Sequence, residues 1–203
     1  MPLIDYNDPQ AWLDTYRLKK ASDPNVWADG FVRDCSVAGA APTDAGRIIT
    51  ALGLNNAHRI AFIGAGYGWI AKAVADQIGA AVVAIDTSTI IQAGKAANAD
   101  IDIYALDLDS GQGRATVRQV LGIQGNNPAD YAITEDVITV LSDQECIDMS
   151  AQLHILATTV VHWSTMKSQG GSQDPRFNWK TPAEWKALLP NDLFIQRSGD
   201  VVL

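Results

Sequence analysis

The chain has 203 residues, of which 47% are hydrophobic and 19% charged, so it has the length of one domain and is too apolar for a disordered segment. Its 15 Lys and Arg residues against 23 Asp and Glu residues give a net charge of −8, which disfavours nucleic acid as a partner. It shows neither a secretory signal nor about 18 successive apolar residues, so we expect a cytoplasmic protein with no membrane partner.

The cysteines and histidines favour neither a disulfide framework nor a metal centre. Cys35 and Cys146 lie far apart and form no CxxC pair, which is typical of reduced intracellular thiols, although sequence alone leaves one long-range disulfide open. His58, His154 and His162 show no metal-ligand spacing. We therefore predict no catalytic metal.

In chain order, the first 45 residues predict helices. Acidic residues followed by proline open helices at about 9–20 and 24–35, because proline at the first helical position loses no hydrogen bond. Thr43 can cap a third helix that stops at Gly53. Within a single domain over 1–203, residues 1–45 therefore form a helical appendage or lid.

Residues 58–203 alternate between short apolar strands and helices, the pattern of a parallel sheet in an α/β fold. The predicted strands are 59–63, 81–85, 101–106, 130–134 and 158–163, the predicted helices are 69–78, 88–97, 114–121 and 143–156, and a final helix over 182–189 precedes an antiparallel hairpin of 193–197 with 201–203. Two capping boxes, one beginning at Ser142 and one at Thr181, fix two of the helix starts.

The polar segment 164–180 has the length of a surface loop that serves as a lid or binding segment. It contains Lys167, Arg176 and Lys180, a small basic group on an acidic protein. This group either receives an anionic substrate or is simply solvated.

A glycine cluster joins the first strand of this region to the next helix. Gly64, Gly66 and Gly68 leave backbone amides and a positive helix end open to a ligand. Asp86 ends the second strand, 22 residues after Gly64, which is the right distance to accept hydrogen bonds from a ribose. These features predict a nucleoside-containing cofactor at the carboxyl ends of the strands.

The spacing is GxGxG, because Trp69 stands where a GxGxxG dinucleotide fingerprint needs glycine or alanine. With its flanking strand and helix and with Asp86, residues 58–203 resemble the class I S-adenosylmethionine-dependent methyltransferases. The resemblance implies a Rossmann-like, doubly wound, seven-stranded, mostly parallel sheet with a C-terminal antiparallel hairpin. It also implies S-adenosylmethionine as the cofactor.

The resemblance further implies which residues bind the cofactor. The glycines lie under its methionine part, Asp86 binds its ribose, and Asp107 with Leu108 meets its adenine. The full expected set is Gly64, Ala65, Gly66, Gly68, Asp86, Thr87, Asp107, Leu108 and Glu135. Simpler roles exist for the acidic members: Asp86 as a helix cap, Asp107 as a solvated turn carboxylate and Glu135 as a loop cap.

Three side chains are candidates for proton transfer from a hydroxyl or amine acceptor. Glu135 and Asp136 follow the fourth strand, where the family places residues near the methyl group and substrate, and His162 closes the fifth strand. Asp136 has the alternative role of a loop cap, and a lone histidine more often has a structural role.

Thr134 to Val137 lacks the (Asp/Asn)-Pro-Pro-aromatic motif of amino-methylating nucleic-acid enzymes, so we expect a small-molecule acceptor. One departure is Phe62, which stands where many members carry an acidic residue. Two alternatives remain open. The first is a non-catalytic cofactor-binding or regulatory domain, and the second is an NAD-dependent oxidoreductase, which Trp69 and the closing hairpin oppose.

Overall fold

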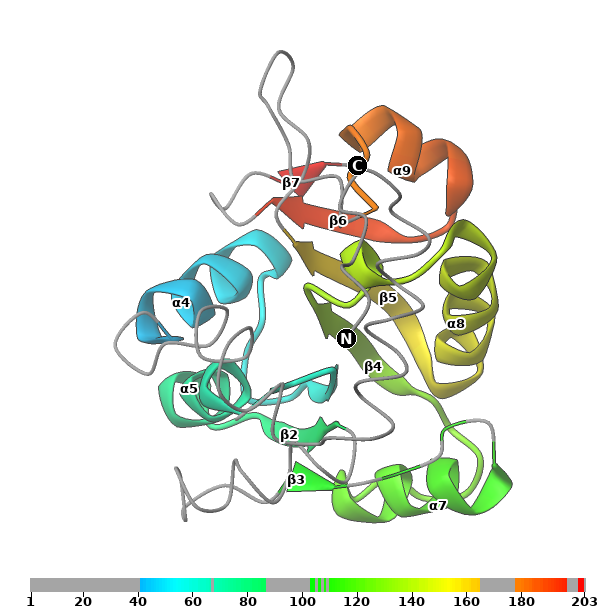
Figure 1. Ribbon diagram of the computed structural model, residues 1–203. Helices are drawn as coiled ribbons and strands as arrows, with labels where there is room; N and C mark the ends of the chain where they lie inside the picture. The colour runs from blue at the N-terminus through cyan, green and yellow to red at the C-terminus, as the bar shows by residue number, and fades with distance from the viewer. Residues whose placement is uncertain are drawn as a thin grey trace, which may run out of the picture.

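The computed structural model describes residues 41–66, 68–86, 103–104, 106, 108, 110–164, 178–196 and 201–202. These residues form an α/β fold in which one sheet has helices on both faces (Figure 1). The helices predicted at 9–20, 24–35 and 88–97 and most of the 164–180 loop lie outside the described residues. Among the described helices, none combines the length and the apolar character that a membrane span requires.

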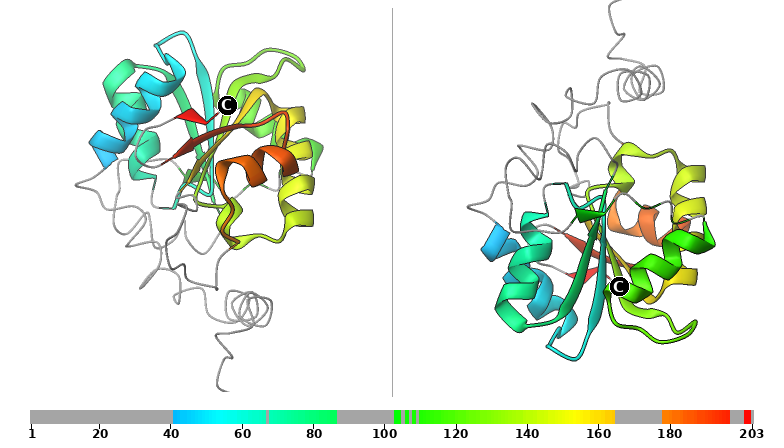
Figure 2. Two further views of the ribbon diagram at one scale, coloured as in Figure 1. Left: turned by 90° about the horizontal axis from the view of Figure 1, so that it is seen from above. Right: turned by 90° about the horizontal axis from the view of Figure 1, so that it is seen from below.

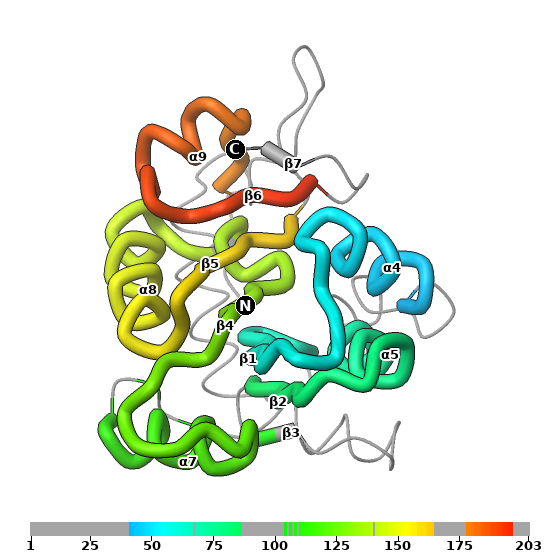
Figure 3. Tube along the Cα trace, turned by 180° about the vertical axis from the view of Figure 1, so that it is seen from behind, coloured from blue at the N-terminus to red at the C-terminus, as the bar shows by residue number. Residues whose placement is uncertain are grey.

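The strands follow the order β3-β2-β1-β4-β5-β6-β7 across the sheet (Figure 3). Five of them have four or more residues: β1 (Arg59–Ile63), β2 (Ala81–Ile85), β4 (Ala129–Glu135), β5 (Ala157–Ser164) and β6 (Leu193–Gln196). The edge strands β3 (Ile103–Tyr104) and β7 (Val201–Val202) have two residues each. Pairing is parallel from β3 through β6, and β7 runs antiparallel to β6.

The predicted parallel α/β sheet is therefore confirmed, but its edges are smaller than expected. Five strands of four or more residues carry the sheet, so the predicted seven-stranded sheet is present only with two-residue strands at its edges, and the predicted closing hairpin is reduced to two residue pairs. Strand β2 is apolar along its whole length and β1 is apolar after its exposed first residue, Arg59, as expected for strands that are covered on both faces.

Helices α4 (Ala41–Leu52) and α5 (Trp69–Ile78) cover one face, and α7 (Gly111–Val120), α8 (Asp143–Leu156) and α9 (Pro182–Leu188) cover the other (Figure 2). The core accordingly has two layers. Ile48 of α4 and Val74 of α5 pack with Phe62 on the first face. Val117 of α7 and Leu153 of α8 pack on the second.

Local signals in the sequence account for most helix boundaries. Both predicted capping boxes are present: Ser142 and Thr181 each accept a hydrogen bond from the backbone N–H of the glutamate three residues on. Helix α4 begins at Ala41, before the predicted cap Thr43. Helix α7 begins at Gly111, earlier than predicted, because the Ser110 hydroxyl caps it by accepting from the Gly113 amide at 2.9 Å.

Cys146 lies in a third apolar cluster between α8 and α9. Burial raises the pKa of its thiol from 9.0 to about 12. This thiol is free and contacts the Ile138 carbonyl oxygen at 3.5 Å, so Cys146 acts as a packing residue. Cys35 lies outside the described residues.

A chain of polar side chains, buried except for His154 of α8, crosses the sheet face under α8 and α9. The Asp192 carboxylate accepts hydrogen bonds from Nε2 of His154 at 2.7 Å and from Nε2 of His162 at 2.8 Å. The other ring nitrogen of His162 lies 2.8 Å from the Thr134 hydroxyl. Thr134, His162 and Asp192 are each 0% exposed, so the chain has the order of a hydrolase triad but is closed to any substrate.

These contacts predict how Asp192 affects stability. Burial opposes its charge, but the hydrogen bonds from His162, Ser150 and His154 hold the pKa of Asp192 below its ordinary value of 3.8. Because the pKa of Asp192 is lower in the folded chain than in the unfolded chain, the ionised carboxylate stabilises the fold at pH values above the unfolded-state pKa. This stabilisation is lost as the pH falls through the folded-state pKa. We expect Asp192→Asn to lower the free energy of unfolding by about 3 kcal/mol at pH 7.

The measurement is urea unfolding of both proteins between pH 7 and pH 3. The difference in the free energy of unfolding between wild type and Asp192→Asn should be constant from pH 7 down to about one pH unit above 3.8. At lower pH this difference should become smaller. Asp148→Asn, at an exposed carboxylate on α8, is the control and should change little. An Asp192→Asn variant as stable as wild type would contradict the prediction.

Candidate functional site

The candidate site lies at the edge where the parallel strands β1, β2, β4 and β5 have their carboxyl ends. Gly64 follows β1, Asp86 follows β2, Asp136 follows β4 and Ser164 is the last residue of β5. Because these strands are neighbours in the sheet, the four residues share one edge. Ligands of open α/β sheets bind at this edge.

The glycine loop turns sharply between β1 and α5. Gly64, Gly66 and Gly68 have φ values of 68°, 56° and 73°, a left-handed conformation that side chains disfavour. The Gly66 amide donates to Oδ2 of the half-buried Asp86 at 2.7 Å, and the Gly64 amide donates to the Ile85 carbonyl oxygen at 2.9 Å. The loop is thereby fixed to the end of β2.

Gly64 is also constrained by a close neighbour. A Cβ atom built on it would lie 2.2 Å from Cγ2 of Val137, in the segment that follows β4. The absence of a side chain at Gly64 therefore brings the β1 loop and the β4 end into direct contact.

The N-terminus of α5 begins at this loop. Gly68 is its N-cap, no side chain caps it, and its first turn contains no acidic residue. The positive end of the helix dipole is therefore not offset by a side chain of this helix. A glycine-lined turn, an uncapped helix and a carboxylate on the next strand together suit a ligand with a sugar diol and a polar chain.

The β4 end supplies two acidic residues, both nearly buried. Glu135 is 7% exposed and pairs in register with Trp163, whereas Asp136, at 9%, is the first residue beyond the strand. Asp136 has a φ of 52°, and it is the one non-glycine residue with positive φ in the part of the chain that the structure describes. A short 3-10 helix, η1 (Ile138–Val140), follows it and was not predicted from the sequence.

Of the other predicted site residues, His162 lies away from this edge, Leu108 follows β3, and two lie outside the described residues. His162 faces the α8 and α9 side and contacts Phe194, and both its ring nitrogens are engaged. Leu108 accepts a hydrogen bond from Arg114 through its carbonyl oxygen and packs beside the second core layer. Thr87 and Asp107 lie outside the described residues.

Phe62, where the family often has an acidic residue, is fully buried in the first core layer. Sequence reasoning missed Val137 and Ser164. The predicted strand ended one residue before Ser164, and nothing in the sequence indicated the contact of Val137 with Gly64.

Lys180, predicted as part of a basic group, forms an ion pair with Asp143. Within the described ranges, no group of three or more His, Cys, Asp or Glu residues could hold a metal ion.

No protein-family model matches the chain, and no curated protein matches it. Solved structures, in contrast, match the chain in fold. Human N-acetylserotonin methyltransferase in complex with SAM aligns with a TM-score of 0.56 and 15% identity over 97% of this chain, which spans 55% of the human enzyme. Magnesium protoporphyrin IX methyltransferase from Synechocystis PCC 6803 with bound SAH aligns with a TM-score of 0.57 and 17% identity, over 89% of this chain and 88% of that one. The chain therefore has the fold of SAM-dependent methyltransferases.

The Gly64 contact yields a prediction with an internal control. Gly53→Ala places a Cβ in open space at φ +61° and should cost only the left-handed strain, about 1 kcal/mol. Gly64→Ala adds the collision with Val137 and should cost about 1–3 kcal/mol more in the free energy of unfolding. Urea unfolding of both variants measures the difference.

Val137→Ala in the Gly64→Ala background should recover part of the loss, because the nearest remaining Val137 atom would be Cβ at 3.7 Å. Equal costs for Gly53→Ala and Gly64→Ala would show that the β1 loop and the β4 end are not in contact.

Proposed function

We propose that this chain is a methyltransferase that uses S-adenosylmethionine and acts on a small-molecule acceptor. The observation that carries the proposal is the turn between β1 and α5, where three left-handed glycines keep side chains away from the α5 N-terminus and the Asp86 carboxylate holds the Gly66 amide at 2.7 Å. The fold shared with SAM-dependent methyltransferases supports it.

The residues at this edge suit the cofactor chemically. The amides of Gly64, Gly66 and Gly68 already donate within the protein, which corrects the expectation that they are open to a ligand. The α5 N-terminus, without a side-chain cap, would hold the polar methionine part of the cofactor, because the first amides of a helix have no intrahelical partner and the glycine turn places no Cβ in front of them. Asp86 would accept hydrogen bonds from the ribose hydroxyls while it keeps the loop in place. Thr87, Asp107 and Leu108 complete the proposed cofactor set on the strength of the sequence resemblance.

S-adenosylmethionine supplies a methyl group on a positively charged sulfur, and its transfer to a hydroxyl or ammonium acceptor leaves S-adenosylhomocysteine and one proton. The protein's task is then alignment and removal of that proton. Asp136 is the proposed proton acceptor, and Glu135 the proposed neighbour of the cofactor. His162 was a third candidate, but its engaged nitrogens and complete burial fit a structural role better.

The acceptor class is proposed from two observations. The solved relatives are named for small acceptors, N-acetylserotonin in one and magnesium protoporphyrin IX in the other. The net charge of −8 gives this chain no overall attraction for nucleic acid.

Ligand-dependent melting tests the cofactor. A ligand that binds only the native state at about 100 times its Kd stabilises it by about 2.7 kcal/mol, so SAM and SAH should raise the Tm and NAD should not. Asp86→Ala should lose the shift, whereas Asp76→Ala, at an exposed carboxylate of α5 paired with Lys72, should keep it. A shift with NAD alone would favour the oxidoreductase alternative.

Turnover tests the chemistry. With methyl-labelled SAM and a panel of phenols and primary amines, Asp136→Asn should lower kcat about 10²–10⁴-fold at unchanged SAH affinity, because asparagine tolerates the left-handed backbone but takes up no proton. Ligand binding with no turnover on any acceptor would favour the non-catalytic cofactor-binding domain.

A further inference from the structure

We infer that Ser164 is a positioning residue that orients the Asp136 carboxylate at the acceptor side of the site. Contacts of Asn178 and Lys180 with the segment that follows β4 hold the Asp136 backbone in place. The inference rests on the proposed function, because it assigns a task to Asp136. It concerns Ser164 and Asn178, which the sequence analysis did not single out, and Lys180, which it named only as part of a basic group.

The Asp136 backbone is held in a conformation that a non-glycine residue rarely adopts. Left-handed φ costs about 1–2 kcal/mol and persists where the surroundings impose it. Here the Asp136 amide donates to the Trp163 carbonyl oxygen at 2.9 Å, and the Thr139 hydroxyl donates to the Asp136 carbonyl oxygen at 2.8 Å. Both backbone polar groups of Asp136 are therefore bonded, and the chain direction after β4 is fixed.

Ser164 fixes the side chain. Its hydroxyl donates to Oδ1 of Asp136 at 3.0 Å, and Ser164 is only 1% exposed. Because Ser164 is the last residue of β5 and pairs in register with Gln196 of β6, the sheet itself determines where this hydroxyl lies. A donor on a rigid strand orients a carboxylate more reliably than a donor on a loop.

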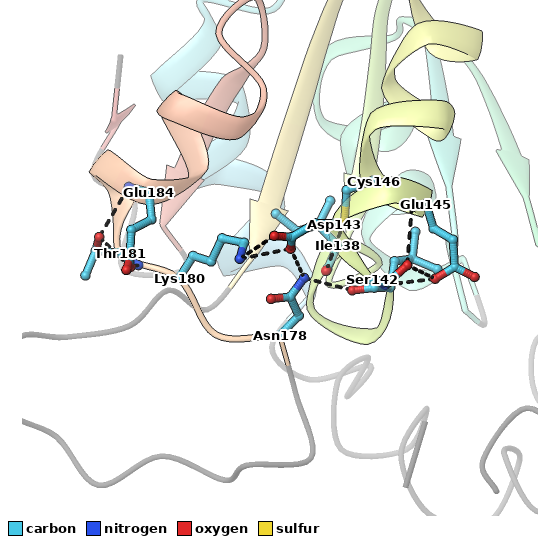
Figure 4. Close-up of polar contacts among 10 residues, drawn as sticks. Ile138, Ser142, Asp143, Glu145, Cys146, Asn178, Lys180, Thr181 and Glu184 are labelled. Atoms are coloured by element: carbon cyan, nitrogen blue, oxygen red, sulfur yellow. Dashed lines mark hydrogen bonds and ion pairs between the residues drawn. The ribbon is translucent and has the colours of Figure 1, made fainter. Parts of the chain in front are cut away.

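The segment before α9 holds η1 from outside. The Asn178 amide donates to the Thr139 carbonyl oxygen at 2.7 Å, and its side chain donates to the Leu141 carbonyl oxygen and to Asp143 at 2.9 Å each. Lys180 lies 2.9 Å from Asp143, and Figure 4 shows Asn178 and Lys180 directed toward the start of α8. We call these contacts of Asn178 and Lys180 the clasp.

The clasp reaches Asp136 through one residue. Thr139 accepts from Asn178 through its carbonyl oxygen and donates to Asp136 through its hydroxyl. Lys180 lowers the pKa of Asp143, and the bond is partly exposed, so we assign the clasp a holding role and not a large share of stability. Ser164 and the clasp thus act on different parts of Asp136.

This arrangement separates the two acidic candidates. Glu135 belongs to the strand, and its position follows from the sheet register. Asp136 lies beyond the strand, and three separate hydrogen bonds hold it in a strained conformation. Strain maintained in this way is typical of residues whose geometry matters to a reaction, so Asp136 is the better proton acceptor.

The experiment compares Ser164→Ala, Ser164→Thr and Ser150→Ala. Ser150 is a matched control, since it is a nearly buried serine whose hydroxyl bonds to a different carboxylate, that of Asp192. Crystal structures of the three variants and of wild type, each with SAH, show where the Asp136 carboxylate lies. We expect it to turn away in Ser164→Ala and to keep its place in Ser164→Thr and Ser150→Ala.

Kinetics with the best acceptor of the phenol and amine panel supply a second readout. Ser164→Ala should lower kcat about 10–100-fold with unchanged KM for SAM, because the carboxylate that takes up the acceptor's proton is then misaligned. Ser164→Thr should restore kcat, and Ser150→Ala should change only the Tm.

An Asp136 carboxylate that keeps its wild-type position in crystals of Ser164→Ala would overturn the inference, with or without an acceptor in hand. A wild-type kcat in that variant would overturn it too. Failure of wild type to bind SAM or SAH would instead overturn the proposed function, and crystals grown without ligand would still decide whether Ser164 orients Asp136.

Discussion

The hydrogen bond from the Gly66 amide to the Asp86 carboxylate is the constraint on which the candidate site depends. It joins the turn after β1 to the end of β2, at 2.7 Å, and so converts a flexible glycine segment into a shaped surface. Left-handed glycines are entropically costly to order, and one charged acceptor that holds an amide offsets part of that cost. The contact of Gly64 with Val137 then brings the β4 end against the same loop.

Behind this edge, the protein keeps its polar groups in two separate systems. One runs from Thr134 through His162 and Asp192 to His154, beneath α8 and α9, and it stabilises the packing of β5, α8 and the segment before β6. The other surrounds Asp136 at the strand ends. Side chains alternate along β4, so Thr134 points to the α8 and α9 side and the next residue, Glu135, points to the opposite side of the sheet.

Local chemistry explains why some features could be predicted and others could not. The helix starts at Ser142 and Thr181 depend on side chains three residues apart, and the α5 boundaries depend on flanking glycines, so the sequence contains the whole signal. The helix predicted over 114–121 begins earlier, at Gly111, because Ser110 caps it. The role proposed for Ser164 depends on contacts between residues 28 apart in sequence, and no periodicity reports those.

The candidate site shows the same division. The glycine spacing and Asp86 could be recognised as a motif, because turns and strand ends contain characteristic residue types that are visible in the sequence. The left-handed conformation of Asp136 was not, since it results from bonds to Trp163 and Thr139 that exist only in the folded chain.

Cys146 gives the folded chain a property of practical use. A thiol with a pKa of about 12 and no exposed surface is almost entirely protonated at neutral pH, so alkylating reagents cannot attack it while the apolar layer beneath α8 and α9 stays intact. The rate at which an alkylating reagent labels Cys146 therefore reports how often that layer opens, so this thiol is a built-in probe of local unfolding.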